Sequence, residues 1–105
     1  MPEDAPYYMD ITLHPLAKAS TADLKDYPWP KGDDPSRFAG LRERALTLKK
    51  ETPYAVVSGI SGVVYEICWY LRGLEQWFCD LMGDSAFCEA MLDQTLKFWF
   101  DWFRL

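Results

Sequence analysis

Proline is confined to the first half of this chain, and this restricts where long regular elements can form. All seven prolines lie at or before residue 53. Because proline lacks a backbone N–H and fixes φ, it interrupts helix interiors and central strands. We therefore predict an irregular, turn-rich arm over residues 1–40, with a short strand or hairpin at residues 7–13 that Pro15 limits. Residues 41–105 are expected to form a helix–strand–loop–helices segment.

Capping residues mark two helix starts in the first half. Ser20 supplies a hydroxyl cap for a short helix that should end at Tyr27, before Pro28. Asp34 followed by Pro35 is typical of a second helix start. Apolar residues recur at three- and four-residue steps from there to about residue 51, which predicts one packed and one solvated face.

Glycines divide the second half into three further predicted helices. Gly73 and Gly83 are expected to interrupt the chain, with Asp84 as the next N-cap. The predicted helices cover residues 63–71, 74–81 and 85–105.

Between these helical regions, residues 54–57 (Tyr-Ala-Val-Val) form a short apolar run without alternation. Such a run is typical of a strand buried on both faces of a parallel sheet. The ladder hydrogen bonds of that strand need neighbouring strands. Either the strand in the arm supplies one, or the remaining strands belong to a longer polypeptide.

The last predicted helix is apolar on nearly every side. Phe87, Met91 and Trp99 belong to one stripe, Trp102 widens it, and Phe100 lies near the opposite side. A helix that is apolar all round is normally buried, so we expect a core helix and an interior piece of a larger fold. The alternative is a membrane interface, which the acidic residues of this half disfavour.

Length and charge exclude several classes of protein. The chain has 105 residues and a formal net charge of −5. It is too short for a complete TIM barrel, which takes about 250 residues. An acidic chain is also a poor sequence-independent nucleic-acid binder. The first ten residues hold three acids and no base, so we expect no signal peptide and a cytoplasmic protein.

The chain offers few residues for metal or redox chemistry. Its three cysteines, Cys68, Cys79 and Cys88, show no CxxC spacing. We predict that they are small buried apolar side chains and that they bind no metal with His14, the single histidine.

Two groups of residues near the predicted strand are candidates for ligand contact. The loop at residues 59–62 could cradle an anion at a helix N-terminus, but two glycines are a weak signal and a plain strand-to-helix turn explains the loop better. Glu66 and Tyr70 are one helical turn apart and share a side of the following helix. The alternative, which spacing alone favours, is that Tyr70 is a core aromatic and that Glu66 pairs with Arg72 or another surface base.

Several longer phrases carry a family resemblance. They are His-Pro-Leu-Ala at residues 14–17, Asp-Tyr-Pro-Trp-Pro at 26–30, Asp-Pro-Ser-Arg-Phe at 34–38, Tyr-Ala-Val-Val at 54–57 and Tyr-Glu-Ile-Cys-Trp-Tyr-Leu-Arg-Gly at 65–73. Together they resemble the uroporphyrinogen decarboxylase-like superfamily, which includes haem-pathway decarboxylases and corrinoid-dependent methyltransferases. The resemblance implies an α/β fold, namely a partial (β/α)8 TIM-barrel segment that is mostly helical, with one or two short strands.

The same resemblance implies a substrate site but no catalytic residue in this chain. Tyr70 matches the tyrosine that contacts the tetrapyrrole in the decarboxylases, and we take Ser58, Gly59, Ser61, Gly62 and Glu66 as further substrate-binding candidates. The active-site aspartate and arginines of the decarboxylases would precede residue 1. The zinc-binding histidine and cysteines of the methyltransferases would follow residue 105, so zinc and corrinoid are expected only in a longer parent. The loop at residues 58–62 departs from the decarboxylase pattern, which favours the methyltransferase-like branch.

Two hypotheses for function follow from the sequence. In the first, the chain is a piece of a uroporphyrinogen decarboxylase-like protein that acts on a tetrapyrrole or a methyl-corrinoid, and it is inactive alone. In the second, it is a small acidic helical interaction module that forms homo-oligomers or binds a partner through its aromatic C-terminal helix.

Overall fold

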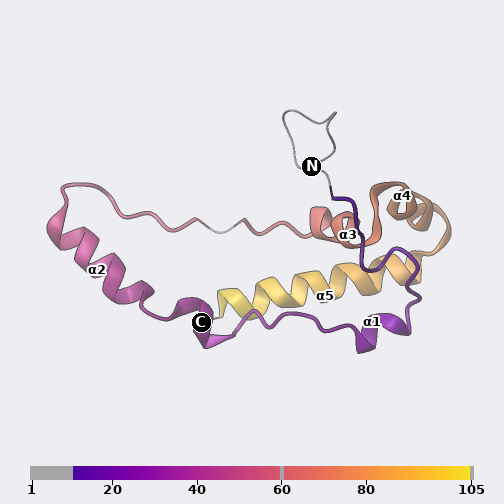
Figure 1. Ribbon diagram of the computed structural model, residues 1–105, viewed down its shortest axis with the longest axis horizontal. Coiled ribbons are helices and arrows are strands. Elements are labelled where there is room, and N and C mark those ends of the chain that lie inside the picture. The colour runs from indigo at the N-terminus through magenta and orange to yellow at the C-terminus, as the bar shows by residue number, and fades with distance from the viewer. Residues whose placement is uncertain (1–10, 60, 105) are drawn as a thin grey trace. The chain divides into compact units, whose positions relative to one another are not determined.

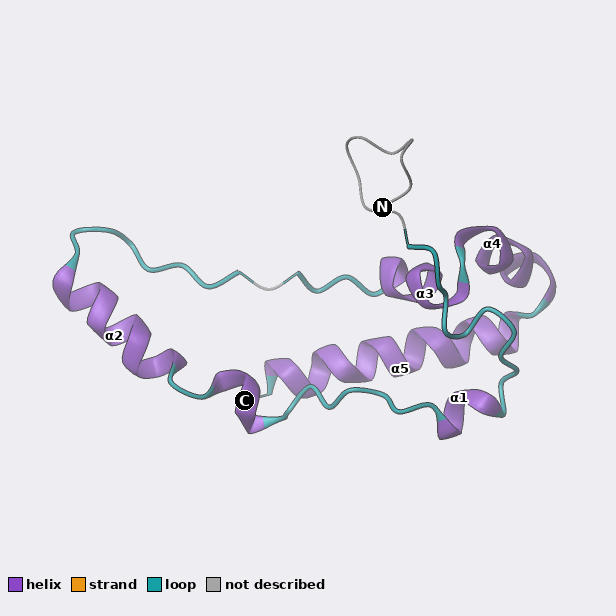
Figure 2. Cartoon of the chain, viewed as in Figure 1, coloured by secondary structure: helices purple, strands orange, loops and turns teal. Residues whose placement is uncertain are grey.

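The regular structure of this protein is helical throughout the part of the chain that the structure describes. The computed structural model describes residues 11–59 and 61–104, and Figures 1 and 2 show their path. The α-helices are α1 (Asp23–Asp26), α2 (Leu41–Glu51), α3 (Tyr65–Arg72), α4 (Leu74–Gly83) and α5 (Ser85–Phe103), and a 3₁₀ turn covers Pro35–Phe38. The prediction of a mostly helical chain is confirmed.

The chain divides into two compact units. Residues 1–29 and 63–96 make the first unit, and residues 30–62 and 97–105 make the second. Helix α5 therefore contributes its first part to one unit and its last part to the other. The predicted division into an arm over residues 1–40 and a barrel segment over 41–105 stays a prediction.

The first unit has a small core to which the arm contributes. Leu16 and Leu24 come from the arm and are 3% and 2% exposed. They join fully or almost fully buried side chains of the three C-terminal helices, namely Cys68, Trp77, Phe87, Cys88 and Met91. The part of the arm that holds Leu16 and Leu24 thus belongs to the packed structure of this unit. Burial of these two side chains against the helices removes apolar surface from water and stabilises the unit.

Glycine and capping signals mark the boundaries between the helices, although α3 begins at Tyr65 rather than at residue 63 and α4 ends at Gly83 rather than at residue 81. Gly73 has φ +90° between α3 and α4, a conformation that favours glycine. The Asp84 carboxylate accepts from the Phe87 N–H at 3.0 Å and caps α5. Ser20 and Asp23 bond each other reciprocally at the start of α1, with the Ser20 N–H donating to the Asp23 carboxylate at 2.7 Å.

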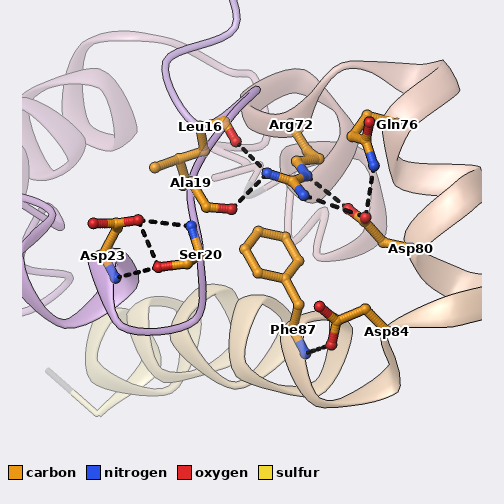
Figure 3. Close-up of polar contacts among 9 residues, drawn as sticks. All are labelled: Leu16, Ala19, Ser20, Asp23, Arg72, Gln76, Asp80, Asp84 and Phe87. Atoms are coloured by element: carbon orange, nitrogen blue, oxygen red, sulfur yellow. Dashed lines mark hydrogen bonds and ion pairs between the residues drawn. The ribbon is translucent and has the colours of Figure 1, made fainter.

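The buried Arg72 guanidinium joins the arm to the helices of the first unit (Figure 3). Its Nε and Nη2 donate to the Asp80 carboxylate of α4 at 2.6 and 3.2 Å. Its Nη1 donates to the carbonyls of Leu16 and Ala19, each at 2.8 Å. The guanidinium also lies 4.1 Å from the centroid of the Phe87 ring. One cation therefore satisfies two arm carbonyls and a buried carboxylate at once.

Asp80 is held in its charged form by this arrangement. Burial by itself would raise the pKa of the Asp80 carboxyl, but hydrogen bonds from Arg72 and Gln76 and the charge of Arg72 outweigh it and lower that pKa. The Gln76 amide donates to Asp80 Oδ1 at 2.8 Å. Because the folded-state pKa is depressed, this pair stabilises the fold at neutral pH and loses its contribution only in acid.

The predicted strand at residues 54–57 is not formed. These residues are irregular and exposed, with Tyr54 77% and Val57 85% exposed. The physical reason is that a strand needs a neighbouring strand for its backbone hydrogen bonds, and the described residues contain none. The other predicted strand, at residues 7–13, lies mostly outside the described residues.

Three further expectations need correction. The helix predicted over residues 35–51 is interrupted, because Gly40 adopts φ +73° between the 3₁₀ turn and α2. Helix α2 also has no buried residue, so its apolar positions do not pack as predicted. Cys68 and Cys88 are buried as expected, but Cys79 is exposed because it lies on the outer side of α4.

We predict that Arg72→Met destabilises the first unit by about 3 kcal/mol, because it leaves the buried Asp80 carboxylate and two arm carbonyls without their donor. Urea unfolding followed by circular dichroism measures this loss. Arg44→Met, on the exposed surface of α2, is the matched control and should change the free energy of unfolding by less than about 0.5 kcal/mol. Equal effects of the two substitutions would contradict the role given to Arg72.

Candidate functional site

Tyr70 and Glu66 both lie on α3 in the first unit, but their surroundings differ. Tyr70 is half-buried, and its ring meets Trp69 edge-on with centroids 4.1 Å apart. The Tyr70 carbonyl accepts from His14 Nδ1 at 2.8 Å. Glu66 is exposed, and its expected partner Arg72 pairs with Asp80 instead.

The loop candidates belong to the second unit. Ser58, Gly59, Ser61 and Gly62 are all exposed, and Gly62 has φ +55°. Residue 60 lies outside the described residues. Within neither unit do the six predicted substrate-binding residues form one site, so their joint role stays a prediction.

A small pocket that the sequence did not suggest lies beside the turn between α3 and α4. It has a volume of about 500 Å³ and is lined by His14, Gly73, Leu74, Glu75, Gln76 and Cys79. His14 donates through Nδ1, and among the described residues its Nε2 has no hydrogen-bond partner. Among the described residues, no group of three or more His, Cys, Asp or Glu side chains is arranged to hold a metal ion. A lone histidine carries little signal in sequence, and this pocket depends on the arm folding against Gly73.

The second unit contains an aromatic cluster that consists of Phe38, Phe98, Trp99 and Trp102. Phe38, from the 3₁₀ turn, meets Trp102 edge-on with centroids 5.0 Å apart. Phe98, Trp99 and Trp102 lie within one turn of α5 and contact one another with centroids 5.1–6.0 Å apart. All four rings remain partly exposed, so the cluster presents apolar surface to the solvent rather than a sealed core.

Two neighbours explain how this cluster assembles. A Cβ on the buried Gly32 would overlap the Phe98 carbonyl oxygen and lie 2.8 Å from the backbone nitrogen of Trp102. Only glycine therefore allows the chain to approach α5 this closely. The Arg37 guanidinium then lies 5.4 Å from the Phe98 centroid and 5.6 Å from that of Trp102. At such distances a guanidinium is attracted to both ring faces.

A groove runs beside the aromatic cluster. Its volume is about 770 Å³, and its lining is mostly apolar with one cation; the residues are Pro35, Phe38, Ala39, Leu41, Arg42, Trp102 and Phe103. Phe103 is 62% exposed and Leu41 is 49% exposed. The aromatic stripe of α5 was visible in the sequence, whereas its contact with Phe38 and Arg37 was not. The expectation that a larger fold buries this end of α5 stays a prediction.

Comparison with protein-family models, curated proteins and solved structures finds no match to this chain. No helix in the described part of the chain has the length and apolar character needed to cross a membrane.

We predict that Gly32→Ala separates residues 30–38 from α5 and disperses the aromatic cluster, because the added methyl group meets backbone atoms that cannot move aside. The indole N–H resonances of Trp99 and Trp102 should shift in NMR spectra, while those of Trp69 and Trp77 in the first unit stay in place. Gly83→Ala is the matched control, since nothing lies within 4 Å of its added Cβ. Unchanged Trp99 and Trp102 resonances in Gly32→Ala would contradict this account.

Proposed function

We propose that this chain is a segment of a uroporphyrinogen decarboxylase-like protein, whose complete barrel acts on a tetrapyrrole by decarboxylation or on a methyl-corrinoid by methyl transfer. The motif phrases at residues 26–30 and 65–73 support the family. The exposed apolar run at residues 54–57 is the observation that carries the segment hypothesis. Its Val57 side chain is 85% exposed although valine gains from burial and from strand pairing.

The surface of α2 supports the same proposal. Leu46 and Leu48 are 57% and 42% exposed on a helix without a single buried residue. In a (β/α)8 barrel, helices cover strands and strands pair with one another. Further strands beside residues 54–57 would give both the run and the leucines of α2 the cover that they lack within the described residues.

In that barrel we assign substrate contact to Tyr70 and give the loop at residues 58–62 a place beside it. The half-buried Tyr70 ring, packed on Trp69, is suited to contact a flat apolar ligand with its face and to donate through its hydroxyl. Zinc or a corrinoid would come from the rest of the parent, and no residue of this chain is assigned to bind either.

The test uses a protein that carries this segment together with the rest of the barrel. We expect Tyr70→Phe to raise the KM for uroporphyrinogen decarboxylation, or for methyl transfer from methylcobalamin, by about tenfold, because one hydroxyl contact to the bound substrate is lost. Tyr65→Phe, which removes a hydroxyl from the same helix at a residue with no assigned substrate contact, is the matched control and should leave KM unchanged. Unchanged kinetics in Tyr70→Phe would show that the Tyr70 hydroxyl does not contact the substrate and that the residue serves only in packing. A reading frame that encodes no barrel on either side of this segment would overturn the proposal.

A second function is favoured by the aromatic cluster. We propose that the chain alone is an interaction module that associates through the aromatic end of α5. A partly exposed group of four rings beside an apolar groove is the kind of surface that marks a protein interface. Trp, Phe and Arg together are also the residues most enriched at the centres of such interfaces.

Sedimentation velocity of the 105-residue chain tests this second function. We expect association at about 10–100 μM, the range in which exposed apolar surface associates. Association should be at least tenfold weaker in Trp102→Ala, which removes one of the two rings that belong to the cluster and also line the groove. Lys18→Ala, an exposed change in the arm, is the control and should associate like the original chain. A chain that stays monomeric across the whole range would contradict the interaction module.

A further inference from the structure

Helix α4 presents an apolar face that nothing in the described part of the first unit covers. Its inner side holds the buried Trp77 and Asp80. Its outer side carries large apolar residues that are exposed, namely Leu74 (45%), Phe78 (52%), Leu81 (42%) and Met82 (90%). The spacing of Leu74, Phe78 and Leu81 is i, i+4, i+7, the pattern with which an amphipathic helix anchors itself in a groove.

The groove of the second unit has the complementary shape and composition. It is open and mostly apolar, and Phe38, Leu41 and Phe103 line it together with Arg42. Arg37 lies on the adjoining aromatic cluster. Within the described residues, Arg42 forms no ion pair, so its charge remains available to a ligand with acidic side chains.

The charge of the chain is divided between its two units in opposite senses. The first unit carries three Lys and Arg against eleven Asp and Glu, a formal net charge of −8. The second carries eight Lys and Arg against five Asp and Glu, a formal net charge of +3. Helix α4 itself has no lysine or arginine, and its outer face includes the exposed Glu75. The acidic, apolar helix and the basic, apolar groove are therefore complementary surfaces of one sequence.

We propose that the groove takes α4 of a second copy of this chain, so that copies associate head to tail. This proposal rests on the interaction module proposed above and names its partner. Leu74, Phe78 and Leu81 of one copy enter the groove beside Phe103 and Trp102 of the next, and Glu75 lies toward Arg42. The interface is heterologous, since two different surfaces meet, and it leaves one free groove and one free α4 at the ends of each assembly.

Complementation between two variants tests the arrangement. Phe78→Ser removes the central anchor of α4, and Phe103→Ser removes an exposed ring from the groove. We expect each variant alone to associate at least tenfold more weakly than the original chain in sedimentation velocity. An equimolar mixture should form a 1:1 complex and nothing larger, because one variant keeps an intact groove and the other keeps an intact α4. Higher salt should weaken this complex.

Phe100→Ser is the matched control, since Phe100 is 55% exposed on α5 and does not line the groove. It should associate like the original chain, and circular dichroism of all three variants should show unchanged helix content. Association of the original chain that Phe78→Ser leaves intact would overturn the α4 contact while the interaction module stands. A mixture that stays monomeric would also overturn it. A monomeric original chain would remove the interaction module itself.

Discussion

The first unit depends on a single buried cation. The Arg72 guanidinium pairs with the Asp80 carboxylate and at the same time donates to the carbonyls of Leu16 and Ala19. Those carbonyls belong to a segment with little regular structure, whose polar groups could not otherwise be buried without cost. Because their donor is supplied, Leu16 can enter the core beside the helices. His14 adds a parallel bond to the Tyr70 carbonyl, so the two ends of this short segment are tied to the last turn of α3.

The helix ends could be predicted from sequence because they are local. Gly73 and the Asp84 cap act on residues within one turn of themselves and fall where the pattern places them, whereas α4 includes Gly83 and ends two residues later than predicted. The strand at residues 54–57 could not be settled in the same way, because a strand exists only when another strand pairs with it. Gly40 shows a different limit. Its positive φ interrupts the predicted helix and separates the 3₁₀ turn from α2. The spacing of apolar residues is continuous across Gly40 and does not predict this interruption.

Only the α5 residues of the aromatic cluster could be predicted from the sequence. Phe98, Trp99 and Trp102 follow from helical spacing, since residues three and four apart share a face. Phe38 and Arg37 were not predictable partners, because they are some 60 positions away and reach α5 only through the close approach at Gly32. The role of that glycine is set by backbone atoms of a distant helix, which leave no mark on the local pattern. The same holds for the pocket at His14, which forms where the arm crosses Gly73.

Helix α5 is buried in its first part and exposed to solvent in its last part. Its first part buries Phe87 and Met91 among the core residues, whereas Phe103 in its last part is more than half exposed. The hydrophobic effect favours burial of apolar side chains in both parts of the helix. The last part therefore keeps apolar surface whose exposure to water is unfavourable. That surface lies in the unit with net charge +3, beside arginines, in a chain that is acidic as a whole. Whatever covers it, whether further barrel strands or a second copy, gains most if it brings both apolar side chains and carboxylates.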